Sequence, residues 1–424
     1  MIRLNVIIFI ILIQNLFAID ATMEIIKTKS TIPTISVVVS SDTDLKSAIA
    51  KKISELVTKD LLVSGHFNNS EVVIDSKFNR DPKYNILKQN GIDLYLLIQV
   101  NINQLNGVMV NTKLYDVNTN SLVLAKSYSS SNKVRYPFLS HKIAIDINKY
   151  LDAPSIEWMD KFVIFSRYLN AKVSEIVVSD YTLTYQKVVV KGGLNIFPKW
   201  ANKNQESFYY TTYKYGVPTL IKQNLYTKQT QRLLSSDGML ICSDVSSDGK
   251  KLVLTMAPNS QPDIYVYDVE TKLKSRITTY KGIDVGGNFV ENDTKIVFVS
   301  DRLKYPNIFS KEIGRKGVER LIYHGKNNSQ STTYNDYIVY SSRETHNEFG
   351  GNAFNLYLIS TKSDYVRRLT VNGRNQFPRF SLDGESILYI KNDNRSSYLG
   401  IIRVNYNKSF LFTLKTGKLQ SIDW

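Results

Sequence analysis

The chain has 424 residues, enough for two domains, and a formal net charge of +16. Its basic residues are scattered, without a run of five, which indicates a general compositional bias. This distribution argues against a nucleic-acid-binding protein. The single cysteine, Cys242, excludes an intrachain disulfide, so packed sheets must stabilise the fold. We expect its thiol to be a buried apolar side chain and not a nucleophile.

The first 18 residues have the pattern of a secretory signal. A short basic start is followed by the apolar run Val6–Ile13 and by the small residue Ala18. A membrane anchor is the alternative, but this run is short for a bilayer span. We therefore predict export and cleavage after Ala18.

Residues 19–33 lie between the signal and the first predicted strand, outside the pattern of either domain. Met23, Ile25 and Ile26 would suit addition as a strand to the sheet edge of a partner. A disordered terminus is the equal alternative.

Residues 34–153 predict a mixed α/β domain with a sheet of about five strands and helices on one face. Five strands are expected. The first is centred on Val37, and the others cover Glu71–Asp75, Leu94–Asn103, Met109–Val117 and Leu122–Tyr128. Three helices are expected. The first begins after Asp42 or Thr43, the second begins at Asp81 with Pro82 in its first turn and ends at Gly91, and the third covers Phe138–Leu151. The first of these helices carries an apolar stripe through Leu45, Ile49, Ile53, Leu56 and Leu61.

Residues 154–424 contain an internal repeat. Four Arg-aliphatic pairs lie 44, 44 and 48 residues apart. They are Arg232-Leu233, Arg276-Ile277, Arg320-Leu321 and Arg368-Leu369. Alternating apolar segments precede each pair in the same order, and four strands in about 45 residues are typical of a propeller blade. The period predicts a six-bladed β-propeller.

Residues at the start of each innermost strand are equivalent in this repeat. The positions that can be aligned are Phe197, Cys242, Val285 and Phe377. An apolar ring at the mouth of a propeller would be a docking patch for a protein. The same side chains could instead pack between blades, and the repeat by itself leaves both interpretations open.

Common catalytic and metal-binding motifs are absent from the sequence. His66, His141, His324 and His346 are scattered, and Asp248, Asp293 and Asp383 lie at turns, where a carboxylate typically accepts hydrogen bonds from its own backbone. We expect no enzyme activity, metal or cofactor. An exported propeller hydrolase, or a propeller related to peptidases, is the alternative function.

The order of signal, α/β domain and six blades resembles the TolB family, the periplasmic propeller proteins of the Tol-Pal envelope system. Specific matches are Ser174–Gln186, Lys191–Trp200 and Gly417–Trp424. The resemblance covers essentially the whole chain and implies a monomeric, non-enzymatic scaffold in the periplasm. The segment Ser331–Tyr334 departs from the family pattern, since it lacks both the proline and the Asp-Gly turn.

The resemblance also implies partners. Phe197, Cys242, Val285 and Phe377 fall where the family contacts the lipoprotein Pal. The segment Asp20–Lys29, with Asp20, Met23, Glu24, Ile25, Ile26 and Lys27, falls where the family binds the C-terminal domain of TolA, although it departs from the commoner family sequence. Other outer-membrane or peptidoglycan-associated proteins are further implied partners, with a role in membrane integrity and constriction at division.

Overall fold

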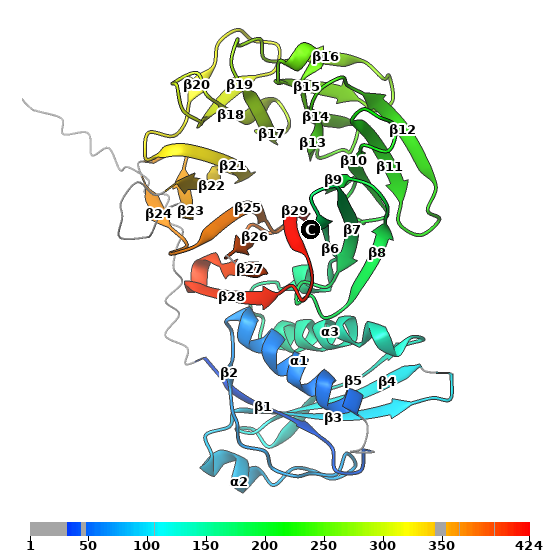
Figure 1. Ribbon diagram of the computed structural model, residues 1–424. Coiled ribbons are helices and arrows are strands. Elements are labelled where there is room, and N and C mark those ends of the chain that lie inside the picture. Colours follow the sequence, from blue (N-terminus) through cyan, green and yellow to red (C-terminus); the bar gives the residue numbers. More distant parts are fainter. Residues whose placement is uncertain (1–31, 44–47, 106, 344–352, 364, 394) are drawn as a thin grey trace, which may run out of the picture.

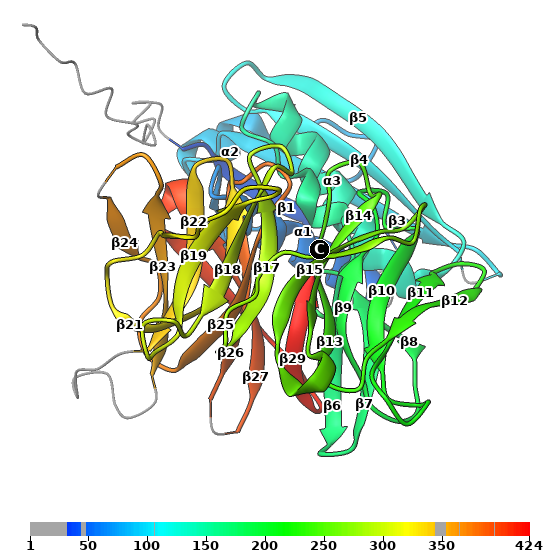
Figure 2. The same cartoon turned by 90° about the horizontal axis from the view of Figure 1, so that it is seen from above.

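The computed structural model describes residues 32–43, 48–105, 107–343, 353–363, 365–393 and 395–424. They form an α/β domain followed by a β-propeller (Figure 1), which confirms the predicted fold class. Seen from above, the propeller strands run side by side, and the α/β domain lies toward one end of them (Figure 2). No helix within the described ranges is long and apolar enough to cross a membrane.

The α/β domain contains one five-stranded sheet with the order β2-β1-β3-β4-β5. Its strands are β1 (Thr34–Val39), β2 (Asn68–Asn69), β3 (Leu94–Ile102), β4 (Val108–Asp116) and β5 (Ser121–Ser130). Its helices are α1 (Ala48–Ser64), α2 (Tyr84–Gln89) and α3 (Tyr136–Tyr150). The short 3-10 helices η1 (Lys133–Arg135) and η2 (Glu157–Asp160) flank α3.

Both faces of this sheet are covered, so the expectation of helices on one face was only partly right. Helices α1 and α3 pack on one face, against alternate residues of β3 such as Leu96 and Ile98. The short helix α2 packs Leu87 on the other face, against Tyr95 and Leu97. A strand buried on both faces carries an unbroken apolar run, which explains Leu94–Ile98.

Two local predictions in this domain were wrong. Glu71–Asp75 is not a strand, and two of its carbonyl groups accept hydrogen bonds from side chains instead of from a neighbouring strand. The hydroxyl of Ser36 donates to Val72 O at 2.9 Å, that of Tyr95 donates to Ile74 O at 2.7 Å, and Val73 is 73% exposed. Helix α2 begins at Tyr84, so Pro82 precedes the helix instead of occupying its first turn.

The described residues form six propeller blades of four strands each. From the innermost strand outward, the blades are β9 (Asn195–Trp200), β10 (Ser207–Thr212), β11 (Thr219–Asn224) and β12 (Thr230–Ser235); β13 (Leu240–Val245), β14 (Lys251–Met256), β15 (Asp263–Asp268) and β16 (Lys274–Arg276); β17 (Asp284–Val290), β18 (Lys295–Ser300), β19 (Asn307–Glu312) and β20 (Glu319–Arg320); β21 (Lys326–Tyr334), β22 (Tyr337–Arg343), β23 (Phe354–Ser360) and β24 (Val366–Arg368); β25 (Arg374–Phe380), β26 (Ser386–Asn392), β27 (Ser397–Arg403) and β28 (Lys408–Thr413); and β29 (Lys418–Asp423), β6 (Val163–Asn170), β7 (Val173–Ser179) and β8 (Gln186–Val190). The last blade joins the two ends of the propeller, because the C-terminal strand β29 pairs with β6. The inner strands lie around the axis of the propeller (Figure 1), and the cavities that their residues line form a central channel.

The Arg-aliphatic repeat has a packing explanation. Each aliphatic residue packs against a different hydrophobic cluster between or within blades. These residues are Leu233, Ile277, Leu321 and Leu369. At least one of the preceding arginines contacts the neighbouring strand, since Arg276 of β16 forms an ion pair with buried Asp263 of β15 at 2.5 Å. The repeat therefore marks the outer edge of each of these blades.

A buried charged cluster joins the two domains. His141 of α3 places Nδ1 2.7 Å from Asp60 of α1, and its Nε2 lies 3.4 Å from Asp180 in the turn after β7. Tyr181 of the same turn donates its hydroxyl to Asp60 at 2.5 Å. All four side chains are inaccessible to solvent. Burial opposes a charge on His141, but Asp60 and Asp180 outweigh it and raise the pKa of His141 to about 10.

A second contact between the domains lies at the end of α1. His66 contacts the Asn148 side chain at 2.5 Å and the Tyr406 hydroxyl at 2.6 Å. Arg403, which is fully buried, donates from Nε to Ser64 O at 3.1 Å. Burial, together with the nearby Arg403 charge, lowers the pKa of His66 to about 4, despite the Asn148 contact. Polar contacts thus tie α1 and α3 to two blades.

Candidate partner-binding site

Every inner strand of the propeller carries an irregularity in its pairing with the next strand. In three of them, a non-glycine residue has a left-handed φ, namely Phe197 at 53°, Gln330 at 52° and Phe377 at 53°. A bulge of this kind leaves one residue out of the ladder and redirects its side chain. Pro198 and Pro378 follow two of these residues, where a missing N–H is tolerated.

The bulges bring the predicted docking residues together. Phe197, Cys242, Val285 and Phe377 all line one cavity of about 260 Å³ at the start of the inner strands. We call this end of the channel the first mouth. Its other lining residues are Pro198, Met239, Ile241, Ser243, Thr255, Gly286, Asn288, Gln330, Ser331, Arg379 and Ser421.

One member of this ring, Gln330, was not predicted from the sequence. Gln330 occupies the bulge position in the blade whose opening, Ser331–Tyr334, lacks a proline. Its side-chain oxygen accepts a hydrogen bond from the backbone N–H of Phe377 at 3.1 Å. Gln330 directly precedes the blade opening Ser331–Tyr334, as Phe197 precedes Pro198, so the repeat alignment could have identified it. The ring is therefore apolar on four blades and amide-bearing on a fifth.

The four predicted residues differ in accessibility. Phe197, Val285 and Phe377 are half-buried, whereas Cys242 is 3% exposed and belongs to a cluster with Tyr209 and Leu252. Burial raises the pKa of the Cys242 thiol, so the thiol is neutral, as expected for a packing residue. Cys242 is thus a packing residue, whereas Phe197, Val285 and Phe377 keep part of their surface exposed where they line the cavity, and their role in docking stays a prediction.

Exposed apolar side chains lie at the same end of the propeller as the first mouth. Most of them lie in connections at the ends of the strands where the inner strands begin, as the pairing of Asn195 with Thr212 and of Lys418 with Tyr168 shows, and Leu169 lies near the end of β6. These residues are Leu169, Tyr213, Tyr215, Val217, Met239, Ile283, Tyr323 and Val371. Tyr323 alone is 76% exposed. Such a rim around a concave apolar centre is typical of a protein-binding surface.

An ion network separates the first mouth from the other end of the channel. Lys199 of β9 lies 2.9 Å from Asp423 of β29 and 3.4 Å from Asp244 of β13, and Arg379 of β25 is 3.8 Å from Asp423. Burial opposes a charge on Lys199, but the two carboxylates outweigh it and raise its pKa. The network therefore links the inner strands of four blades.

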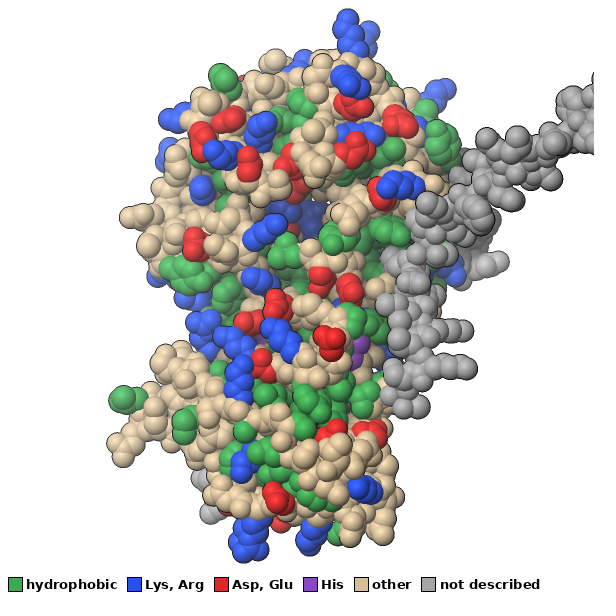
Figure 3. All heavy atoms as spheres, turned by 180° about the vertical axis from the view of Figure 1, so that it is seen from behind, with side chains coloured by type: hydrophobic (Ala, Val, Ile, Leu, Met, Phe, Trp, Pro, Cys, Tyr) green, Lys and Arg blue, Asp and Glu red, His purple; other side chains and the backbone are tan. Residues whose placement is uncertain are grey.

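The second mouth is the opposite end of the channel, with a cavity of about 510 Å³. Lys199, Asp244, Arg379 and Asp423 line it, together with the Asp248 turn. Seen from behind, the propeller is hollowed at its centre, and basic side chains lie in the hollow (Figure 3). The two mouths thus differ in chemistry, since the first is mainly apolar and the second is charged.

The turn carboxylates have the structural roles expected of them, with one difference. Asp248 and Asp383 each accept a backbone N–H two residues ahead. Asp293 instead accepts the backbone N–H of Ser247 in the neighbouring blade at 2.9 Å. Among the described residues, no group of three or more His, Cys, Asp or Glu side chains could hold a metal ion.

The N-terminal candidates lie outside the described residues. These are Ala18, Asp20, Met23, Glu24, Ile25, Ile26 and Lys27, and Leu45 and His346 also fall outside. Their predicted roles stay predictions.

Comparison with known proteins identifies the family. The family model of the TolB beta propeller domain matches residues 161–424, and that of the TolB amino-terminal domain matches residues 21–123. The Tol-Pal system protein TolB of Wolinella succinogenes is 49% identical over 97% of this chain and 98% of its own. This chain belongs to the TolB family.

A further relative and a solved structure support the assignment to the TolB family. The Tol-Pal system protein TolB of Helicobacter pylori strain HPAG1 is 45% identical over 98% of this chain and 99% of its own. The crystal structure of TolB from Acinetobacter baumannii has a TM-score of 0.76 at 20% identity, covering 92% of this chain and 96% of that one. The resemblance stated from the sequence is confirmed, and so is the arrangement of an α/β domain before a propeller.

Proposed function

We propose that this chain is the TolB component of a Tol-Pal system. In this proposal it is a non-enzymatic periplasmic scaffold that binds the lipoprotein Pal at the first mouth and TolA through its N-terminal region. It supports outer-membrane integrity and constriction at cell division. The observation that carries the proposal is the cavity of about 260 Å³ lined by Phe197, Val285 and Phe377, with exposed apolar side chains at the same end of the propeller.

The shape and chemistry of the first mouth favour a protein ligand. A few buried aromatic anchors at the centre of an interface commonly provide most of the binding energy. Phe197 and Phe377 occupy that central position, and rim residues such as Tyr323 and Met239 can exclude water around them. The polar groups Gln330, Asn288 and Arg379 can orient a segment that enters the cavity.

The substitution Phe377→Asp is expected to weaken Pal binding at least about tenfold, because it places an unpaired charge in a desolvated contact at a cost of about 2 to 4 kcal/mol. Titration calorimetry with purified Pal measures the affinity, and a thermal melt reports the fold. Since Phe377 also packs against a core cluster, Met239→Asp provides a second variant, at a side chain that lines the same cavity and is already exposed.

Leu273→Asp is the matched control, because Leu273 is an exposed apolar residue in the turn before β16 and does not line the cavity. Its Pal affinity should equal that of the unmodified protein. Unchanged Pal binding by Met239→Asp, or loss of binding by Phe377→Asp only together with a lowered melting temperature, would assign the ring to blade packing.

The N-terminal peptide gives a separate expected result. Deleting Asp20–Lys29 should abolish TolA binding and leave the melting temperature unchanged, since the peptide precedes β1, the first strand of the α/β domain. If the peptide alternates between its own chain and TolA, the deletion should also alter Pal affinity by a factor of about 5 to 100. Calorimetric titrations of both partners test this, and retained TolA binding would refute the role of the peptide.

Periplasmic location is proposed from the signal-like start of the chain. The exported protein should begin at Ile19, after cleavage behind Ala18. N-terminal sequencing of protein recovered from the periplasm decides this, and a chain that still begins at Met1 would contradict it.

A further inference from the structure

A ring of polar side chains crosses the channel one level beyond the first mouth. Each inner strand contributes one residue to this polar ring, and all six line the second-mouth cavity: Lys199, Asp244, Asn288, Thr332, Arg379 and Asp423. Asp423, Asp244 and Thr332 each accept a backbone N–H of the next blade, at 2.9, 2.9 and 3.4 Å. In blade order, these acceptors alternate with Lys199, Asn288 and Arg379, whose side chains are donors.

The two cations of the polar ring differ in how their charge is compensated. Lys199 lies between two carboxylates, 2.9 Å from Asp423 and 3.4 Å from Asp244. Arg379 has Thr332, a neutral side chain, on one side in this order. On the other side it has only Asp423, which Lys199 already contacts, at 3.8 Å from Nε. Arg379 is therefore the less compensated cation of the two.

The guanidinium group of Arg379 has donors to spare. Its Nε donates to Ile422 O at 3.3 Å, and its two terminal nitrogens have no hydrogen-bond partner within the described chain. The side chain keeps 19% of its surface accessible, so these nitrogens are not sealed in the core. A guanidinium presents its N–H groups as a planar fork that matches a carboxylate. Arg379 can thus take an acceptor from outside the chain.

The opening from which this acceptor comes is the first mouth. Arg379 also lines the first-mouth cavity, where it is the only charged side chain among the lining residues. Gln330 lines the same cavity, and its side-chain oxygen is engaged by Phe377 N, which leaves the amide nitrogen as a second donor. An apolar cavity with a single cation favours a ligand that combines apolar surface with a negative charge.

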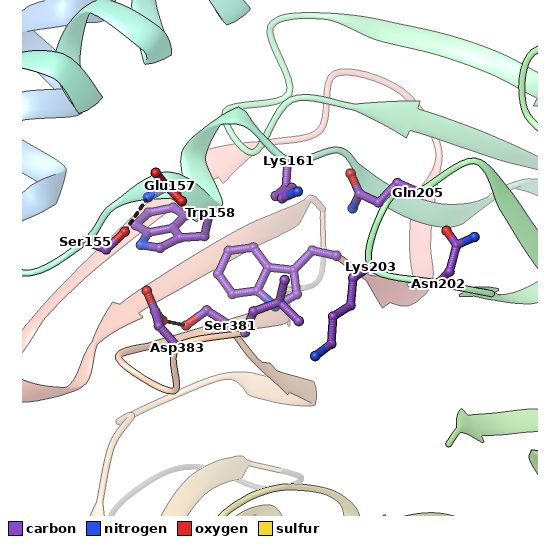
Figure 4. A pocket seen from close by; sticks show the side chains of 11 residues that line it. Ser155, Glu157, Trp158, Lys161, Asn202, Lys203, Gln205, Ser381 and Asp383 are labelled. Carbon is purple, nitrogen blue, oxygen red and sulfur yellow. Dashed lines mark hydrogen bonds between the residues drawn. The ribbon is translucent and has the colours of Figure 1, made fainter. Parts of the chain in front are cut away.

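The openings beyond the polar ring carry both signs of charge. Three basic and three acidic side chains line the second mouth. A further cavity of about 240 Å³ beside it brings Lys161 and Lys203 together with Glu157 and Asp383 (Figure 4). A carboxylate that approached from this end would meet acidic side chains as well as basic ones. Charge selectivity is therefore a property of the first mouth.

We propose that the first mouth selects its partner through a carboxylate, an inference that rests on the proposed docking of a protein there. The bound segment is a loop that carries an Asp or Glu side chain beside apolar residues. Its apolar residues meet Phe197, Val285 and Phe377. Its carboxylate meets Arg379, about 7 Å further along the strand than Phe377, and Gln330 donates a second hydrogen bond. A charged, forked contact of this kind fixes the orientation of the segment.

Two small probes separate the charge from the apolar contact. 3-Phenylpropionate carries a carboxylate beside a phenyl ring, and 3-phenylpropanamide is its neutral counterpart of the same shape. Each is titrated into the full-length mature protein, and the backbone amide signals of Phe377 and Gln330 are followed by NMR. Both probes should shift these signals, and the carboxylate should bind at least about fivefold more tightly than the amide.

Substitutions decide whether Arg379 causes that preference. Arg379→Gln should remove it, whereas Arg379→Lys should retain part of it, because an ammonium group keeps the charge without the planar fork. Arg374→Gln is the matched control, since Arg374 is exposed on the same strand and does not line the cavity. The proposal is overturned if the amide binds as tightly as the carboxylate, if neither probe shifts the signals at about 50 mM, or if Arg379→Gln keeps the preference.

Titration of purified Pal separates this inference from the proposed function. Arg379→Gln should weaken Pal binding about tenfold or more, and exchanging one Asp or Glu of Pal for its amide should cause the same loss, without a further loss when both changes are combined. If the chain prefers the carboxylate probe but does not bind Pal, the carboxylate site stands and the proposed partner is wrong. If Arg379→Gln binds Pal as tightly as the unmodified chain, the proposed function stands and the role of the carboxylate in docking is refuted.

Discussion

Replacing Asp60 with alanine is expected to lower the free energy of unfolding by about 3 to 5 kcal/mol, because the change leaves a buried imidazolium without its nearest carboxylate. His141 would keep only Asp180, at 3.4 Å, and the hydroxyl of Tyr181 would lose its acceptor. The cluster joins α1 and α3 to the turn after β7, so the loss should weaken the contact between the domains as well as each domain. Denaturant unfolding, followed by tryptophan fluorescence, measures the effect.

Glu55→Ala is the matched control on the same helix. Glu55 pairs with Lys51 at 3.8 Å on the exposed face of α1, where an ion pair contributes about 0 to 1 kcal/mol. The two variants remove a carboxylate from the same element and differ in burial. If Asp60→Ala cost no more than Glu55→Ala, the buried cluster would contribute nothing to the junction.

Stability should pass through a maximum near pH 6.5, because two histidines at the domain junction have pKa shifts of opposite sign. The folded pKa of His141 is about 10, above the unfolded value of about 6.5, so its contribution is complete below pH 6.5 and is lost as the pH rises toward 10. The folded pKa of His66 is about 4, so its contribution is complete above pH 6.5 and is lost as the pH falls toward 4. The loss of stability on the alkaline side should be on the order of 5 kcal/mol, and that on the acid side on the order of 3 kcal/mol.

Unfolding free energies measured between about pH 4 and pH 10 test this profile. His141→Gln should flatten the alkaline limb and leave the acid limb, whereas His66→Gln should do the reverse. The test compares how steeply the unfolding free energy changes with pH, so a general loss of stability in either variant does not affect it. A loss of stability at alkaline pH that persists in His141→Gln would show that a group other than His141 causes it.

Local patterns predicted most of the architecture. Five of the six blades are built from contacts close in sequence, and the sixth joins β29 to β6. The Arg-aliphatic pairs and the alternating strands before them were therefore enough to predict six blades. Strands β1, β3, β4 and β5 and helix α3 were also anticipated within a few residues. The segment Glu71–Asp75 failed because its alternation resembled a strand, while its carbonyl groups found partners in the hydroxyls of Ser36 and Tyr95.

The first mouth was partly predictable for the same reason. The repeat aligns Phe197, Val285 and Phe377 at one level of the channel, and the structure brings them to one cavity. Sequence reasoning could not separate Cys242, which packs between blades, from the three half-buried residues. It also missed Gln330, because a bulge is a property of paired strands and its blade lacks the proline that marks two others.

The sequence by itself determined the order of the domains, the number of blades and the apolar level at the start of the inner strands, because each follows from short-range periodicity. Only the tertiary structure decided which side chains meet across that order. Tyr181 reaches Asp60 over 121 positions, and Lys199 reaches Asp423 over 224. Such pairs form because the last strand closes the propeller and α1 and α3 dock on it, and the direction of a buried side chain depends on that closure and not on its neighbours in sequence.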